Sequence, residues 1–163
     1  MTEKASRAGV GKVVLRHVVR ADFPIFFEQQ RDPIANKMAN FPPRDRDAFD
    51  AHWTKILADR EVHKKSILFN EALVGNVVCW EERGRRLVGY WIGREFWGRG
   101  IASRALAGFL QHVQIRPLYA YVAIHNAGSI RVLEKCGFGI TDGVDEPSES
   151  GEKAADDAVF VLS

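Results

Sequence analysis

The stretch Tyr90–Arg104, YWIGREFWGRGIASR, contains three changes of pattern and decides the fold. It closes an apolar segment, Leu87–Ile92, whose composition favours a β-strand. It then crosses a loop, Gly93–Gly100, and enters Ile101–Gln114, where apolar residues recur every three to four positions, as on one side of a helix. A strand, a loop and a helix in this order favour a following parallel strand, and the apolar segment Leu118–Ile124 fits that place. The stretch therefore predicts an α/β fold.

Outward from this unit, the other segments predict an antiparallel sheet flanked by helices. Short turns at Asn70-Glu71 and Glu81–Arg86 join neighbouring apolar segments, which favours an antiparallel meander. The further predicted strands are Lys12–Val19, Ser66–Phe69, Ala72–Trp80 and Ala158–Leu162, and the further helices run from Asp22 to about Asp32, from Asp45 or Asp47 to about Asp59, and from Asn126 to about Cys136. We expect a single domain over residues 1–163. It should have a mixed, mostly antiparallel sheet, one parallel strand pair at the glycine turn, helices on both faces, and a flexible start over residues 1–11.

Length and charge restrict the classes of function. The chain has 163 residues, about one domain, and 46% of them are hydrophobic. With 23 Lys and Arg against 21 Asp and Glu, the net charge is only +2, whereas binding to nucleic-acid phosphates usually needs a larger basic excess. No apolar run reaches the ~18 residues of a membrane span, and the N-terminal segment lacks the apolar core of a signal peptide. We therefore expect a cytoplasmic protein with no membrane or nucleic-acid partner.

The cysteines and histidines do not form a metal-binding pattern. Cys79 and Cys136 lie in apolar segments, and two such residues make neither a disulfide framework nor a zinc site. We expect both to be buried, reduced thiols. The histidines other than His125 show no metal-ligand spacing. The sequence therefore predicts no metal centre.

The loop before the helix has the features of a diphosphate-binding turn. Gly98 and Gly100 can adopt a positive φ and let the backbone approach a ligand closely. The helix start beyond them presents unpaired N–H groups and the positive end of the helix dipole. Three arginines, Arg94, Arg99 and Arg104, add local positive charge. The Rossmann pattern lacks its third glycine here and no Walker triplet occurs, so a tight turn with surface arginines is the alternative interpretation.

Two blocks of residues resemble the GNAT superfamily of N-acetyltransferases. The first, Glu95–Gly100 (EFWGRG), is similar to the family's Gln/Arg-x-x-Gly-x-Gly/Ala motif at a strand-to-helix turn, with Glu95 in place of Gln or Arg. The second, His125–Phe138 (HNAGSIRVLEKCGF), is similar to the Asn-x-x-Ser-x-x-x-hydrophobic-x-Lys-x-Gly-Phe block of the ribosomal-protein N-terminal (Rim-type) branch. The order of elements resembles that of the family over nearly the whole chain.

The resemblance implies acetyl-CoA as a co-substrate and assigns residues to it. The main chain of Trp91, Ile92 and Gly93 would pair with the pantetheine arm. Asn126 would hydrogen-bond the cofactor where the parallel strands separate, and Arg131 or Lys135 would reach the nucleotide end. The pyrophosphate would be held by the N–H groups of Trp97, Gly98, Arg99, Gly100, Ile101, Ala102 and Ser103. From the residues alone, Asn126 is also a plausible helix N-cap, and Arg131 and Lys135 a solvated helix face.

The groups that would move protons depart from the family pattern. Many members carry a glutamate on the strand before the glycine turn and a tyrosine in the last helix. Here Leu87 and Leu133 occupy those positions, and neither can transfer a proton. The resemblance to the Rim-type branch implies Ser129 as the acid in place of the tyrosine. The candidate bases are His125, Glu81 and Glu82, each of which is also a plausible solvated surface group.

The leading hypothesis is acetyl transfer from acetyl-CoA to a primary amine, either a protein N-terminal α-amine or a small amine, by a monomer or homodimer. Without a strong base, the acceptor should be an amine that is already partly neutral. A lysine amine with a pKa of ~10.4 is about 0.1% neutral near pH 7.4, whereas an α-amine with a pKa of ~7.8 is about a quarter neutral. We expect α-amines to be acetylated faster than lysine side chains.

Acceptor choice should rest with Ile25–Leu57 and with the acidic loop Thr141–Asp157. In that loop Asp142, Asp145 and Glu146 favour a cationic acceptor. One alternative is a non-catalytic acyl-CoA-binding domain on the same scaffold, which Leu87 and Leu133 favour. The other is a nucleic-acid module that uses Arg83, Arg85 and Arg86. Formation of an acetylated product separates the first alternative from an enzyme.

Overall fold

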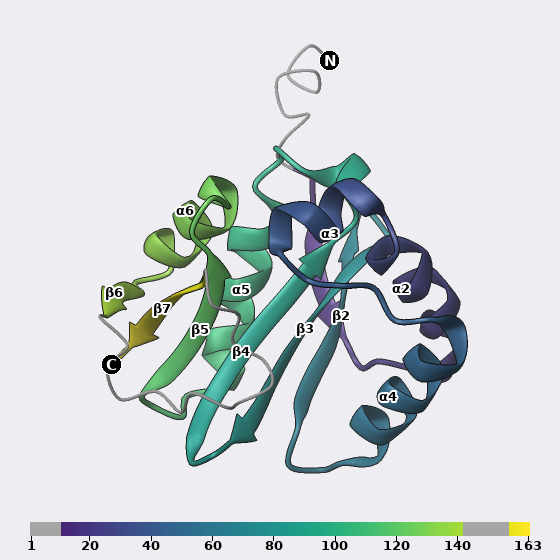
Figure 1. The fold of residues 1–163 in the computed structure, drawn as a ribbon, viewed down its shortest axis with the longest axis horizontal. Coiled ribbons are helices and arrows are strands. Elements are labelled where there is room, and N and C mark those ends of the chain that lie inside the picture. The colour runs from purple at the N-terminus through teal and green to yellow at the C-terminus, as the bar shows by residue number, and fades with distance from the viewer. Residues whose placement is uncertain (1–10, 142–156) are drawn as a thin grey trace.

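The computed structural model describes residues 11–141 and 157–163. Its centre is a seven-stranded sheet in the order β1-β2-β3-β4-β5-β7-β6 (Figure 1). The strands are β1 (Val13–Arg16), β2 (His63–Phe69), β3 (Ala72–Glu82), β4 (Arg85–Ile92), β5 (Leu118–Ala123), β6 (Gly139–Thr141) and β7 (Asp157–Leu162). The neighbouring strands pair antiparallel except β4 and β5, which are parallel. The predicted mixed sheet with one parallel pair is confirmed.

Helices pack on both faces of the sheet, as predicted. They are α2 (Phe23–Gln30), α3 (Pro33–Ala39), α4 (Arg46–Ala58), α5 (Ile101–His112) and α6 (Ala127–Lys135), with short 3-10 helices η2 (Arg20–Asp22) and η3 (Arg94–Phe96). α5 contacts β1 to β4 and α6, whereas α2 contacts α4, β3 and β4. In the part of the chain that the structure describes, none of these helices has the length and apolar character needed to cross a bilayer.

The alternation of side chains along β3 gives the molecule two cores. Val77 is buried in one core with Phe109 of α5. Its neighbour Val78 lies in a second core with Phe26 of α2 and Trp53 of α4. Successive strand residues point to opposite faces, so one strand supports both layers. The second core fixes α2 and α4 beside the sheet and, with them, the chain segment that leads to β2.

The parallel pair is short. Leu87 of β4 lies opposite Tyr119 of β5, and among the described residues no further β4–β5 partner follows, although β4 stays paired with β3 as far as Ile92. Figure 1 shows the two strands diverging toward α3 and α6. The end of β4 is therefore separated from β5 on the side of the sheet where α3 and α6 lie.

The hairpin between β3 and β4 is longer than predicted. Its turn is the dipeptide Arg83-Gly84, with φ values of +52° and +83°, and not the whole of Glu81–Arg86. Glu81 and Glu82 belong to β3, where they pair with Arg86 and Arg85 of β4. A two-residue turn with positive φ at both positions matches the twist of paired strands, so the ladder continues to its edge.

Other predicted boundaries differ by a few residues from those in the structure. β1 ends at Arg16 and not at Val19, β2 begins at His63 and not at Ser66, and α5 ends at His112 and not at Gln114. β6 was not predicted, because three residues are too few to show an alternation; it pairs with β7. Most of the predicted loop Thr141–Asp157, with Asp142, Asp145 and Glu146, lies outside the described residues, as do residues 1–10.

A short helix that the sequence analysis missed lies beside the glycine turn. Asp32-Pro33, expected to end a helix, also begins α3. The Asp32 carboxylate accepts a hydrogen bond from the Ile34 N–H (3.0 Å), and Pro33 takes the first helical position. Asp32 also pairs with Arg94 at 2.6 Å. This ion pair ties α3 to the loop that follows β4.

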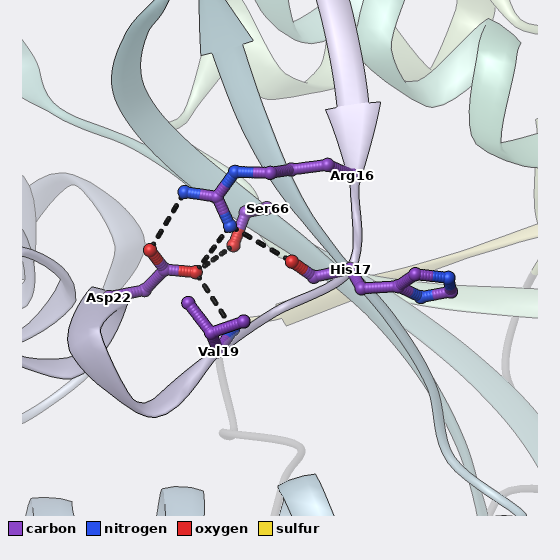
Figure 2. A network of polar contacts seen from close by, with 5 residues as sticks. All are labelled: Arg16, His17, Val19, Asp22 and Ser66. Atoms are coloured by element: carbon purple, nitrogen blue, oxygen red, sulfur yellow. Dashed lines mark hydrogen bonds and ion pairs between the residues drawn. The ribbon is translucent and has the colours of Figure 1, made fainter.

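Asp22 ties the start of α2 to β1 and β2 through a buried carboxylate (Figure 2). It is 3% exposed and accepts hydrogen bonds from both terminal nitrogens of Arg16 (2.8 and 2.9 Å), the Ser66 hydroxyl (2.7 Å) and the Val19 N–H (3.0 Å). Burial alone would raise the pKa of Asp22, but these donors outweigh it and hold the pKa below its ordinary value. Asp22 directly precedes α2, as predicted, but its side chain makes no capping hydrogen bond to that helix.

α6 begins and ends as predicted. The Asn126 side chain accepts a hydrogen bond from the Ser129 N–H (3.2 Å). At the other end Gly137 has a φ of +97°, and the Phe138 N–H donates to the Leu133 carbonyl (3.0 Å). These contacts form a Schellman end. The two ends fix the orientation of the helix that carries Ser129.

Both cysteines carry free thiols, and we expect them to react slowly with iodoacetamide in the folded protein. Cys79 is fully buried and Cys136 is half-buried. Burial raises the pKa of both thiols, and the thiolate is the reactive form. Peptide mass spectrometry over a time course should show Cys136 labelled before Cys79, and both labelled quickly in denaturant. Rapid labelling of Cys79 in native protein, or an internal disulfide, would contradict this expectation.

Candidate active site

A cavity of about 780 Å³ brings most of the predicted site residues together. It lies among the end of β4, the glycine turn, the start of α5 and the start of α6, and we call it the cofactor-side cavity. Twelve of the predicted site residues line it: Trp91, Ile92, Trp97, Gly98, Gly100, Ile101, Ala102, Ser103, His125, Asn126, Ser129 and Arg131. Gly93 and Arg99 do not. The tertiary structure thus joins two sequence blocks, the glycine turn and the start of α6, around one space.

The glycine turn has the predicted backbone. Gly98 and Gly100 have φ values of +79° and +74°, and a Cβ at either position would meet no heavy atom within 4 Å. Gly100 is the N-cap residue of α5 and offers no side chain to its first N–H groups. Open space above unpaired N–H groups and the positive end of a helix dipole suits a diphosphate.

The arginines near the turn are largely occupied by the protein itself. Arg94 pairs with Asp32, and Arg104 donates to the carbonyls of Gly100 and Arg99 (3.3 and 3.2 Å). The Arg99 guanidinium lies over the ring of Phe96, 6.0 Å from its centroid. The charge of Arg94 is therefore offset by the Asp32 carboxylate, whereas Arg104 keeps its charge but directs these hydrogen bonds to main-chain carbonyls, and neither side chain lines the cavity. Cationic side chains that line the cavity come instead from α6, Arg131 and Lys135.

Main-chain groups at the end of β4 have partners in the protein. The Gly93 N–H donates to the Val74 carbonyl (2.9 Å), which directs it toward β3. The Ile92 carbonyl accepts from the Trp97 indole (2.9 Å), a contact that folds the turn back over the strand. Main-chain groups alternate in direction along a strand, so Ile92 points away from β3 and toward the cavity.

At the start of α6, His125 and Asn126 are both engaged. The Asn126 carboxamide oxygen caps the helix, which confirms the N-cap interpretation and leaves its NH₂ group for another partner. His125 is exposed, and its Nε2 lies 3.1 Å from the Lys37 carbonyl at the end of α3. Since a carbonyl only accepts, Nε2 carries the proton and Nδ1 is the nitrogen that can take one.

Ser129 meets a tyrosine that the sequence analysis did not single out. The Ser129 hydroxyl lies 2.7 Å from the Tyr90 hydroxyl of β4. Burial raises the pKa of Tyr90 well above its ordinary value, so the phenol stays protonated in the neutral range. No sequence spacing connects the two residues, because they meet only where β4 and β5 diverge.

A second cavity, also of about 780 Å³, adjoins the first, and we call it the acceptor-side cavity. It is lined by the segment from Gln30 to Ile56, by β3 and β4, and by β5. Its aromatic side chains include Phe41, Trp53 and Trp80, and Phe41 lies 5.7 Å from the Trp91 ring, measured between centroids. Five residues line both cavities: Ala39, Tyr90, Trp91, Asn126 and Ser129.

The titratable groups of the acceptor-side cavity are mixed in sign. Its carboxylates are Asp59, Glu81, Glu82 and Asp157, and its basic groups are Arg44, Lys55 and His52. Burial, with the charges of Arg44 and Lys55, lowers the pKa of His52 to about 4. His52 is therefore neutral near pH 7. It is a basic group that sequence spacing gave no reason to select.

The candidate bases Glu81 and Glu82 line this cavity but have partners. Glu81 lies 3.7 Å from Arg86, and Glu82 accepts from the Trp80 indole at 3.4 Å.

Leu87 and Leu133 are 2% and 1% exposed, so both positions at which the family carries proton-transfer groups are part of the apolar interior. Among the described residues, no group of three or more His, Cys, Asp or Glu lies together as a metal site requires.

Comparisons with known proteins agree with this geometry. Residues 12–139 match the acetyltransferase (GNAT) domain family. No curated protein matches the sequence significantly. An acetyltransferase from Agrobacterium tumefaciens has a similar structure, with a TM-score of 0.75 at 18% identity over 93% of this chain and 90% of that chain.

Two further solved structures share the fold at similar sequence identity. A spermidine N-acetyltransferase from Vibrio cholerae, in complex with CoA and spermine, gives a TM-score of 0.75 at 18% identity over 92% of this chain and 94% of that chain. A GNAT-family acetyltransferase from Bacillus anthracis gives 0.72 at 16% identity over 93% and 95% of the two chains. With the family matched over most of its length, the chain belongs to the acetyltransferase (GNAT) domain family and is an N-acetyltransferase.

Proposed function

We propose that this protein transfers the acetyl group of acetyl-CoA to a primary amine, and that the amine is an α-amine or another amine of low pKa. The observation that carries the proposal is the meeting of two cavities at Tyr90, Trp91, Asn126 and Ser129. A donor held on the glycine-turn side and an acceptor held on the aromatic side would come together there. Holding two reactants at one point is a large part of what such a catalyst must supply.

The cofactor-side cavity fits acetyl-CoA. In this assignment the N–H groups from Trp97 to Ser103 hold the pyrophosphate, and Arg131 reaches the nucleotide end. The main chain of Ile92 and the free NH₂ of Asn126 face the arm that joins them. When bound, acetyl-CoA supplies a thioester that an amine can attack. Open space above Gly98 and Gly100 supports the assignment, since a close backbone approach is possible at both.

The acceptor-side cavity supports an amine acceptor of modest size. Its lining includes the segment from Gln30 to Ile56, within the region expected to choose the acceptor. Its aromatic rings can pack against an apolar or cationic acceptor, and its carboxylates favour a cation. Spermidine, the substrate in the name of the Vibrio cholerae enzyme, is one small amine of this kind. The Rim-type block at α6 points instead to a protein N-terminus, and this is the acceptor that the proposal favours, because an alkyl primary amine such as those of spermidine has a pKa about as high as that of lysine.

The chemistry follows from the residues at the junction. A neutral amine must attack, and buried Leu87 offers no base for it. Glu81, Glu82 and His125 remain candidates through a water molecule, and His125 offers Nδ1 as its acceptor. The Ser129 hydroxyl is the candidate group for the departing sulfur. We also propose a cytoplasmic location, where both free thiols would persist.

A second candidate function is a non-catalytic acyl-CoA-binding domain. Leu87 and Leu133 favour it, because both are buried where the family carries its proton-transfer groups. Acetyl-CoA binding that is tight, together with no release of free CoA against a panel of amines, would support this alternative.

The test of the cofactor assignment is a bulky side chain at the glycine turn. We expect Gly100→Trp to weaken acetyl-CoA binding at least tenfold in isothermal titration calorimetry, equivalent to ~1.4 kcal/mol. Gly84→Trp is the matched control. Gly84 has a φ of +83° and equally open surroundings, but it lies in the β3–β4 turn. The control carries the same backbone strain and should bind acetyl-CoA like the wild type. Unchanged affinity in folded Gly100→Trp would overturn the assignment.

A further inference from the structure

The hydroxyls of Tyr90 and Ser129 form a short contact where the two cavities meet. Their oxygens are 2.7 Å apart, with Tyr90 on β4 and Ser129 in the first turn of α6. Both residues line the cofactor-side and the acceptor-side cavities. The contact therefore lies at the point where the proposed function requires a thioester and an amine to react.

Either hydroxyl can donate in this contact, and the distances favour Tyr90 as the donor. The Tyr90 hydroxyl also lies 3.3 Å from the Ser129 carbonyl. Within an α-helix that carbonyl accepts from the N–H four residues on, here Leu133. The Ser129 hydroxyl oxygen is the nearer acceptor, and Tyr90, protonated in the neutral range, has a hydrogen to donate. Donation by Tyr90 to the Ser129 hydroxyl oxygen leaves the serine hydrogen to point elsewhere.

We propose that Tyr90 is a positioning residue, which orients the Ser129 O–H toward the sulfur that leaves during acetyl transfer. The inference rests on the proposed function, because it assumes a thioester at the junction. The acceptor nitrogen bonds to the acetyl carbon as the carbon–sulfur bond breaks, and the bond's electron pair goes to sulfur. Ser129 donates a hydrogen bond to that developing thiolate. The nitrogen loses a proton to water and the thiolate gains one from water, so neither hydroxyl is consumed.

This arrangement accounts for the missing tyrosine of the last helix. Leu133 lies one turn after Ser129 on α6 and is buried, so no hydroxyl comes from that position. Tyr90 reaches the same turn of α6 from β4. A thiol with a pKa near ~8.5 leaves as a thiolate without full proton transfer, so one oriented hydrogen bond is sufficient help.

The experiment is a double-mutant cycle in the full-length protein. Tyr90→Phe keeps the ring and removes the hydroxyl, Ser129→Ala removes its partner, and the double variant removes both. Tyr119→Phe on β5 is the matched control, since Tyr119 packs its ring against Arg85 and lines neither cavity. CoA release with a reactive amine gives kcat and KM, and calorimetry gives the Kd of acetyl-CoA.

We expect each single variant to lose about tenfold or more in kcat, with the KM and Kd for acetyl-CoA unchanged. The double variant should lose no more than Ser129→Ala alone, because the two hydroxyls act as one unit. Ser129→Thr, which keeps a hydroxyl, should retain more activity than Ser129→Ala when Tyr90 is present and lose that advantage in Tyr90→Phe.

Three outcomes would overturn the inference. Losses that multiply in the double variant would show that Tyr90 does not act through Ser129. A kcat unchanged in Tyr90→Phe, or a loss confined to KM and Kd, would make the contact structural. Wild-type protein that binds acetyl-CoA but releases no CoA with any amine would overturn the proposed function and this inference together.

Discussion

A peptide with a free N-terminus is expected to be acetylated on the order of 100-fold faster, in kcat/KM at pH 7.4, than an N-blocked peptide carrying a lysine. The buried Leu87 stands where the family carries a base, so the acceptor must lose its proton mainly in solution. The neutral fraction of an α-amine is then a few hundred times that of a lysine amine. The two peptides should share sequence and length, so that only the nucleophile differs.

The pH dependence of kcat/KM shows whether the preference for the α-amine comes from its larger neutral fraction or from tighter binding of that peptide. kcat/KM for the α-amine peptide should rise with pH and level off near the amine's own pKa of ~8, whereas the lysine peptide should gain rate until about pH 10. No enzyme group should add a further step between about pH 5 and 7. Equal or better activity on the lysine peptide, or a step in that range, would indicate a strong base on the enzyme. Glu81, Glu82 and His125 would then be the first variants to make.

Asp22→Ala is expected to destabilise the fold by about 2–4 kcal/mol. The carboxylate is buried and accepts four hydrogen bonds, and its removal leaves the Ser66 hydroxyl and the Val19 N–H without their acceptor. Urea unfolding followed by tryptophan fluorescence measures the difference. Asp50→Ala is the matched control: Asp50 forms an exposed ion pair with Arg46 on α4, and exposed pairs of this kind contribute little. Equal losses in the two variants would contradict the role assigned to Asp22.

The same carboxylate gives the pH dependence of stability a direction. The pKa of Asp22 is lower in the folded protein than in the unfolded chain, where it is ~3.9. Its contribution is therefore fully present above pH ~4 and is lost as the pH falls through the lower folded value. The free energy of unfolding of the wild type should drop more steeply than that of Asp22→Ala below pH ~4.

The local patterns of the sequence were sufficient for the class of fold. Hydrophobic alternation and helical periodicity predicted β3, β4, α4, α5 and β5. The strand–loop–helix–strand order predicted that β4 and β5 pair in parallel. The N-cap interpretation of Asn126 was confirmed, because it depends only on the first turn of α6. The contacts of Asp22 could not be predicted in this way, because they depend on donors outside its own helix, such as the Ser66 hydroxyl.

The glycine turn was also readable from sequence. Gly98 and Gly100 adopt the predicted positive φ because the chain must reverse between a strand and a helix start within a few residues. The partners of the charged side chains around the turn could not be predicted from the sequence. Arg94 and Arg104 are adjacent to it in sequence, but Asp32 and nearby carbonyls hold them in the folded chain.

By itself, the sequence determined the α/β class, the family and the two blocks that belong to one site, since each depends on spacing within a short segment. Only the tertiary structure decided how the blocks meet. β4 and β5 separate after Leu87, and this separation brings the Tyr90 hydroxyl to Ser129 and sets the acceptor-side cavity beside the glycine turn. Such contacts depend on strand divergence and helix packing over long sequence separations, which no local periodicity records.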